Sequence, residues 1–322
     1  MGHGKIRIGE QGYFSASQTG NLFGCGYGTN LDVYERYKGT QGEREISEEA
    51  KKSMEFGTWF EDAVARYFAE RQGWKIRKCG ETAYWSDDMP YFICHPDRLV
   101  VGRDQKGRRV ALEIKCVSPY AEGWGEDGTP EIPDVYYFQV QSYFACDVPC
   151  DVVYVVCMKG NRITSHEISK DPLTVQAIRQ RVKESKAAFD RNEVPEPENY
   201  DEAFRFYSSR VKKDADGVGA NDEVLGLYDQ LIQIHSDQDR LKAEEEGIKQ
   251  DLMERLGDSP AFVTSDGKRL KSIVWWSDTK RSTLDVDRLK AEHPEIDYND
   301  YMKTTDIRSF RVSYPRKERT NG

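Results

Sequence analysis

The sequence predicts an α/β fold, because segments typical of β-strands alternate with segments that have helical spacing. Two strands are expected at 98–101 and 110–116, and the Val-rich run at 152–158 is typical of a buried central strand. Between them, the segment 133–146 has no charged residue from Val135 onward, which indicates a buried helix. We therefore assign the chain to the α/β class.

Apolar residues with helical spacing also predict a helix over 53–72, capped near Ser53 or Thr58 and closed by Gly73. Other elements are expected on both sides of it. In chain order these are a Gly-rich and then charged segment (1–55), two short strands around a turn (82–85 and 91–94), a loop between paired strands (102–107), a Gly- and acid-rich loop (119–131), a strand (163–168) and a helix from Pro172 to about Arg191.

The Pro- and Glu-rich stretch at 193–198 indicates a domain boundary, so we expect a first domain at 1–192 and a linker or irregular arm at 193–221. The C-terminal extension, 222–322, should hold a long helix, a strand, a short helix and a basic tail (222–256, 269–276, 286–291 and 308–322). The long helix is either a partner-binding or oligomer arm or part of a packed helical hairpin. A polar gap at 235–240 argues against a continuous two-stranded coiled coil.

The composition excludes several classes of protein. Hydrophobic residues make up 38% of the 322 residues and aromatic residues 11%, which argues against a disordered chain. The longest strongly apolar run, 152–158, is far shorter than the ~20 residues of a membrane-spanning helix, so no membrane protein is expected. The start of the chain lacks the apolar segment of a secretion signal, so we expect a cytoplasmic protein whose seven Cys are reduced thiols.

The formal net charge of -9 means that any contact with nucleic acid must come from a local basic surface or from metal ions. The basic tail is one such surface, and the alternative for it is a solvated terminus. Its positive residues are Arg308, Arg311, Arg316, Lys317 and Arg319.

The residues that could carry chemistry are Asp97, at the start of one expected strand, and Glu113 and Lys115 on the next. Side chains two apart on a strand share a face, so Glu113 and Lys115 should project together while Leu112 and Ile114 face the core. A hairpin could bring Asp97 beside Glu113 and form a hard-oxygen site for Mg²⁺ or Mn²⁺. Such an ion can polarise a phosphodiester and activate water, and Lys115 could orient that water or stabilise developing charge. The alternative is an ordinary surface ion pair.

Two helical positions could complete such a site. On the first helix, Glu61 is expected to point inward as a third metal or water ligand, whereas Asp62 should pair with Arg66 in solvent. The alternative for Glu61 is a carboxylate favoured by the helix dipole. On the uncharged helix, Gln139 and Tyr143 are i,i+4 neighbours and could form an active-site wall, or simply belong to a core helix.

In this order and spacing, the motifs resemble the phage-type exonucleases of the YqaJ and lambda exonuclease family, within the PD-(D/E)xK nuclease superfamily. The resemblance covers about residues 12–190, and the C-terminal segment resembles extensions on some phage members. The matching motifs are Gly-Tyr-Phe-Ser-Ala-Ser at 12–17, Gly57-Thr58 with Glu61, Pro96-Asp97, Glu113-Ile114-Lys115-Cys116 and the helix with Gln139 and Gln141.

The resemblance implies a restriction-endonuclease-like nuclease core, with a central mixed β-sheet flanked by helices. It implies that Mg²⁺, for which Mn²⁺ can substitute, is held by Asp97, Glu113 and the main-chain carbonyl of Ile114. Lys115 would lie near the attacking water, with Glu61 and Gln139 as supports.

The activity implied by the same resemblance is 5′-to-3′ degradation of one strand of linear duplex DNA. The 3′ tail would feed a single-strand annealing protein in the host cytoplasm of a phage or prophage. Members of the family often form trimeric rings around DNA, so a homo-oligomer is expected.

Lambda-type enzymes read a 5′-phosphate with a small pocket of Arg and Ser. Ser17 matches one such position, His95 stands where Ser would precede Pro-Asp, and Tyr143 is a further candidate for contact with DNA. Glu10 occupies the expected N-terminal Arg position, and 118–120 lack the Arg expected after Lys115. An endonuclease or nickase on the same site therefore stays an alternative.

Outside the enzymes, the alternative is a catalytically silent DNA-binding or assembly protein, against which the intact acidic residues and Lys115 argue. Some related nucleases hold an iron-sulfur cluster through one upstream and three downstream Cys. Here an iron-sulfur cluster is not expected, because two of the downstream candidates fall inside a helix and a strand. The Cys in question are Cys25, Cys146, Cys150 and Cys157.

Overall fold

The computed structural model describes residues 2–7, 9–41, 47–212, 215–265, 270–302 and 309–314. They form two compact units, Met1–Ala203 and Phe204–Gly322, which are described separately below. No helix among these ranges is long and apolar enough to cross a membrane.

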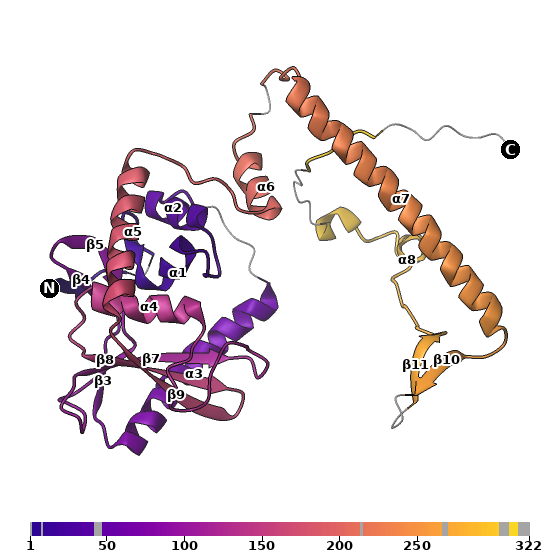
Figure 1. The fold of residues 1–322 in the computed structure, drawn as a ribbon. Helices are drawn as coiled ribbons and strands as arrows, with labels where there is room; N and C mark the ends of the chain where they lie inside the picture. Colours follow the sequence, from indigo (N-terminus) through magenta and orange to yellow (C-terminus); the bar gives the residue numbers. More distant parts are fainter. Residues whose placement is uncertain are drawn as a thin grey trace. The chain divides into compact units, whose positions relative to one another are not determined.

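A five-stranded mixed sheet organises the first unit (Figure 1). Its inner strands β7 and β8 are parallel, and every other neighbouring pair is antiparallel. This confirms the predicted mixed sheet and all four strands expected for it. In sheet order the strands are β3 (Ile76–Lys78), β6 (Arg98–Val100), β7 (Val110–Val117), β8 (Val152–Lys159) and β9 (Arg162–Ser169).

Helices cover both faces of this sheet (Figure 1). On one face, Val64, Ala65 and Phe68 of α3 (Glu48–Gln72) pack against Leu112 and Ile114 of β7. The opposite face carries α4 (Asp134–Ala145), which packs in turn on α1 (Thr19–Leu22) and α5 (Pro172–Asp190). As predicted, the uncharged helix is buried along its second half.

Helix α3 begins earlier than predicted. Ser47 caps it by accepting a hydrogen bond from the Ala50 N–H, so neither Ser53 nor Thr58 is the cap. The first two turns are exposed, and the periodicity of buried residues therefore gave no sign of them. The predicted end is confirmed, because Gly73 closes the helix at φ 70°.

The N-terminal segment is more ordered than the expected Gly-rich loop. It supplies two strands of a second sheet, in the order β1-β4-β5-β2, and the helix α2 (Asn30–Lys38). Thr29 and Asp32 form a reciprocal capping box at the start of α2, a local signal that the sequence did contain. The strands are β1 (Gly2–Lys5), β2 (Phe14–Ser15), β4 (Thr82–Ser86) and β5 (Met89–Cys94).

The expected linker is also partly folded, because α6 (Tyr200–Ser208) lies within it. Glu202 is buried and accepts a hydrogen bond from the Thr29 hydroxyl, and Glu198 accepts one from the Asn30 N–H. These contacts attach the segment up to Ala203 to the first unit. A mainly polar sequence hid them, since the anchoring side chains are carboxylates rather than apolar groups.

The second unit contains the predicted long helix as α7 (Asp222–Leu256) and the predicted short helix as α8 (Val286–Glu292). The predicted strand is β11 (Leu270–Trp275), and it pairs with a strand that was not predicted, β10 (Ala261–Ser265). A short 3₁₀ helix (Tyr298–Tyr301) follows. Of the basic tail only 309–314 is described, so Arg308, Arg316, Lys317 and Arg319 lie outside the described residues.

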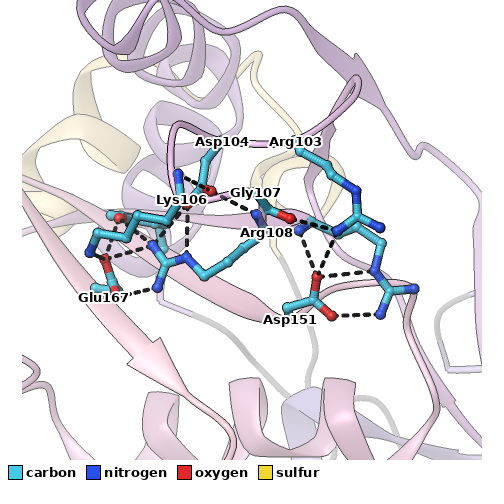
Figure 2. A network of polar contacts seen from close by, with 9 residues as sticks. Arg103, Asp104, Lys106, Gly107, Arg108, Asp151 and Glu167 are labelled. Carbon is cyan, nitrogen blue, oxygen red and sulfur yellow. Dashed lines mark hydrogen bonds and ion pairs between the residues drawn. The ribbon is translucent and has the colours of Figure 1, made fainter.

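Ion pairs connect the loop between β6 and β7 to the edge strand β9 (Figure 2). Arg108 donates to both carboxylate oxygens of Glu167 on β9, at 2.5 and 3.0 Å, and to Asp104 at 2.9 Å. Lys106 and the Tyr154 hydroxyl also contact Glu167. The Arg108 guanidinium lowers the pKa of Glu167 from 4.5 to about 2.

We expect Glu167→Gln to lower the free energy of unfolding by about 1–2 kcal/mol at pH 7. The pKa of Glu167 is lower in the folded chain than in the unfolded chain. Its contribution is therefore complete above pH 4.5 and is lost as the pH falls towards 2. Urea unfolding should show the same difference at pH 7 and pH 5 and a smaller one at pH 3. An equal effect of the exposed control Glu122→Gln, or a difference that grows with acidity, would contradict this.

Candidate active site

Asp97 is the residue immediately before strand β6. At this level the edge of β7 that faces β6 is not yet paired with it. The Asp97 Oδ2 instead accepts a hydrogen bond from the Ile114 N–H at 2.7 Å. The carboxylate thus takes the place of a backbone acceptor in the ladder. In an extended strand the N–H and C=O of one residue point to the same edge, so the Ile114 carbonyl lies on the side of Asp97.

Glu113 and Lys115 lie on one face of β7, as predicted. The Lys115 Nζ is 2.7 Å from Glu113 Oε1, and both side chains are largely buried. This burial, on the face covered by α4, argues against the ordinary surface pair that E-x-K also allows.

Helix α4 supplies the side chains that hold Glu113. Gln139 donates to Glu113 Oε1 at 2.7 Å and accepts from Lys115 Nζ at 3.0 Å, and the Tyr143 hydroxyl donates to Glu113 Oε2. The i,i+4 pair on the uncharged helix therefore faces the acidic strand, as expected. Gln141 points elsewhere: it donates to the Ser169 carbonyl at 2.8 Å and accepts from the Asp171 N–H at 3.0 Å.

Burial and like charge dominate the electrostatics of the site. Burial raises the pKa of Asp97 well above its ordinary value, and the negative charges of Glu113 and Glu61 raise it further. Burial disfavours the charged form of Lys115, but attraction to Glu113 and Asp97 outweighs it, so the pKa of Lys115 is raised. Lys115 is therefore a permanent cation at neutral pH. Burial and like charge thus oppose the ionised form of Asp97, and a divalent cation bound beside it would favour that form.

Glu61 is held by a residue that the sequence analysis did not consider, Arg98. The Arg98 guanidinium is 2% exposed and donates to Glu61 at 2.8 Å, to Asp62 at 3.2 Å and to the Asp97 carbonyl at 2.8 Å. Asp62 thus bonds Arg98 as well as its predicted partner Arg66, and it is not simply solvated. An Arg at the start of an apolar strand needs acidic partners if it is buried, and this could have pointed to the contact with Glu61.

An aromatic cluster centred on Tyr136 contacts Lys115. The Lys115 Nζ is 4.7 Å from the centre of the Tyr136 ring, a cation–π contact. The Tyr136 hydroxyl is 2.8 Å from the Tyr27 hydroxyl, and the Trp124 ring is 5.4 Å from the Tyr136 ring. Tyr136 precedes Gln139 by three residues and shares its helix face, so the spacing used for Gln139 could have identified it as well.

The three residues predicted to contact DNA or a 5′-phosphate lie in different environments. Tyr143 is fully buried, so it holds Glu113 and does not present itself to DNA. Nε2 of His95 is 2.8 Å from the Ile6 carbonyl, which agrees with a structural role for that nitrogen. Ser17 is exposed, with its hydroxyl 3.0 Å from that of Ser15, and its role stays a prediction.

The residues present fit a hard divalent cation. The carboxylates of Asp97 and Glu113 and the carbonyl of Ile114 are oxygen donors of the kind that Mg²⁺ and Mn²⁺ prefer. Within the described ranges, no three His, Cys, Asp or Glu side chains lie together as a metal site. Glu61 is paired with Arg98, and its part as a third ligand stays a prediction.

The fold and the site together define a mixed-sheet α/β protein with a buried acidic centre between the start of β6 and the middle of β7. Residues 7–147 match the model of the YqaJ-like viral recombinase domain. The match confirms, for this part of the chain, the resemblance predicted from the motifs.

Similarity to a curated protein extends beyond the domain. The uncharacterized protein YqaJ of Bacillus subtilis (strain 168) is 22% identical over 288 residues, which are 87% of this chain and 85% of that protein.

Solved structures show a weaker likeness. An alkaline exonuclease, LHK-Exo, from Laribacter hongkongensis aligns with 63% of this chain and 96% of its own, at 15% identity and a TM-score of 0.42. A phage related exonuclease from Haemophilus somnus 129PT aligns with 59% of this chain and 95% of its own, at 15% identity and a TM-score of 0.36.

We expect Arg98→Met to lower the free energy of unfolding by about 2–4 kcal/mol, because it removes the buried partner of two carboxylates. The matched control is Arg66→Met, which removes the exposed partner of Asp62 and should cost far less, because a solvated ion pair contributes little. Urea unfolding of both variants at pH 7 measures the difference. Equal losses would show that Arg98 does not organise the α3–β6 junction.

Proposed function

We propose that this chain is a Mg²⁺-dependent deoxyribonuclease, with Mn²⁺ as a substitute, that hydrolyses phosphodiester bonds. The observation that carries the proposal is the arrangement on two adjacent strands: Asp97 bonded to the Ile114 N–H, and Glu113 paired with Lys115. Acidic oxygens beside one buried cation suit a phosphodiester, whose reaction centre is anionic and gains charge in the transition state.

In this proposal Asp97, Glu113 and the Ile114 carbonyl hold the ion. The bound ion would polarise the phosphodiester and lower the pKa of a water molecule. Gln139 and Tyr143 fix the Glu113 carboxylate in one orientation, so it needs little rearrangement to bind.

The raised pKa of Lys115 makes it a donor and a positive charge rather than a general base. Its second partner, Gln139, lets the ammonium group turn from Glu113 towards a phosphate oxygen or a water without losing every hydrogen bond. The Tyr136 ring covers the group from one side and limits the water around it. We therefore assign to Lys115 the stabilisation of developing charge and the orientation of the attacking water.

We further propose an exonuclease that acts on ends of linear duplex DNA in the 5′-to-3′ direction and leaves 3′ single-stranded tails. The viral recombinase domain supports this assignment, since recombination by strand annealing requires such tails. A single-strand annealing protein as partner and a ring-shaped homo-oligomer belong to the same proposal and rest on the family resemblance.

The decisive assay compares linear duplex DNA, with and without a 5′-phosphate, with a covalently closed circle of equal mass. We expect the wild type to degrade only the linear substrate and only with Mg²⁺. Glu113→Gln should reduce cleavage at least about 10³-fold while leaving DNA binding largely unchanged, because it removes a metal ligand but keeps the shape of the side chain.

Glu167→Gln is the matched control, since it makes the same change in an ion pair away from the site and should keep its activity at neutral pH. Normal turnover by Glu113→Gln would reject the site. Cutting of the circle would assign the site to an endonuclease or nickase. Binding of DNA without cleavage of either substrate would assign the chain to DNA binding or assembly.

Lys115→Met keeps the length of the side chain and removes its charge. We expect cleavage at saturating Mg²⁺ to fall by about 10²–10³-fold, because the transition state loses a positive charge. The Mg²⁺ concentration for half-maximal rate should change much less. A variant that regains the full rate when Mg²⁺ is raised would show that Lys115 acts only through metal affinity.

A further inference from the structure

Helix α7 exposes an apolar stripe along most of its 35 residues. The exposed fractions of its side chains range from 40% to 62% at Val224, Leu227, Leu231, Ile234, Leu241 and Ile248. The helix also contains two glycines, each of which disfavours helix by about 1 kcal/mol relative to Ala. Because helices in proteins are stabilised mainly by packing of their apolar faces, α7 needs a partner along this stripe.

The apolar residues of the stripe keep one seven-residue spacing along the whole helix. With Val224 at position a, the a positions are Val224, Leu231, Gln238, Glu245 and Leu252, and the d positions are Leu227, Ile234, Leu241, Ile248 and Arg255. The polar stretch 235–240, which argued against a coiled coil, contains one seam position, Gln238, and the helix runs through it without interruption. Both glycines, Gly226 and Gly247, fall at the outward c position. The repeat therefore predicts a coiled-coil seam.

The charges beside the seam specify the direction of the partner helix. The g positions carry Asp237 and Glu244, and the e positions five residues further on carry Lys242 and Lys249. Two parallel copies in register place each g acid opposite an e lysine of the other copy. An antiparallel pair would place lysine against lysine and acid against acid. The pattern is thus complementary only to a parallel copy of itself.

We propose that α7 pairs, parallel and in register, with α7 of a second copy of this chain. The ion pairs within one helix, Arg240 with Glu244 and Lys249 with Glu245, are solvent-exposed, so exchanging them for pairs between helices costs little. The polar seam residue Gln238 weakens the pairing but specifies its register, whereas Glu245 faces its own copy across the seam and only weakens the pairing.

Contacts within the second unit are compatible with this pairing. The Tyr228 hydroxyl donates to the Ser313 carbonyl, and the His235 ring stacks on Tyr314 at 4.1 Å. Tyr228 and His235 occupy e positions, so residues 313 and 314 lie beside the seam in the N-terminal half of α7. The neighbouring a and d side chains stay exposed.

The test uses two charge variants of the full chain. The acidic variant, Lys242→Glu with Lys249→Glu, makes both flanks negative. The basic variant, Asp237→Lys with Glu244→Lys, makes both positive. Each variant alone should self-associate at least about tenfold more weakly than the wild type in sedimentation at low salt. An equimolar mixture should regain the wild-type affinity, and differently tagged variants should co-purify.

The control is Glu246→Lys with Glu254→Lys. It changes the net charge as much as the basic variant does, but at outward positions, and it should associate like the wild type. Circular dichroism confirms that each variant keeps its helix. Variants that associate like the wild type, or a mixture that fails to recover, would overturn the proposal. The assay reads mass rather than cleavage, so its result is independent of the proposed nuclease activity.

Direction is tested by oxidation of Leu231→Cys, an a position, against Gln233→Cys, an outward c position. A parallel, in-register pair brings the two copies of residue 231 together, so this variant should form a disulfide-linked dimer and the 233 variant should not. Equal cross-linking of the two variants, or none at 231, would reject the parallel register.

Discussion

The two-residue period of strand β7 is the constraint on which the first unit depends. Leu112 and Ile114 point to α3 and build the core, while Glu113 and Lys115 point to α4 and build the site. A shift of one residue would exchange the two sets and bury charge in the core. The hydrogen bond from the Ile114 N–H to Asp97 also fixes the register, because it joins β7 to the residue just before β6. Register and chemistry are therefore fixed together.

Much of this arrangement follows from local patterns. Alternation predicted β7, the Val-rich run predicted β8, and the lack of charge predicted a buried α4, because each pattern reflects burial on one or two faces. Glu113, Lys115, Gln139 and Tyr143 came together as expected, since period 2 and period 3.6 fix their directions.

What could not be predicted depends on contacts between polar groups distant in sequence. Arg98 meets Glu61 across 37 residues, and Glu202 meets Thr29 across 173. Neither contact produces a periodic pattern in the sequence, because each depends on a single charged or hydroxyl group. The exposed start of α3 was missed for the opposite reason, since a solvated turn has no apolar pattern at all. The N-terminal strands gain their order from pairing with β4 and β5, which no local window contains.

The anchoring of α4 has a consequence for the order in which the chain becomes functional. Gln141, buried on α4 itself, bonds Ser169 and Asp171, about thirty residues downstream. Until those residues have left the ribosome, its amide lacks these two partners and α4 lacks its tie to β9 and α5. The acidic centre is therefore completed late in the synthesis of the first unit.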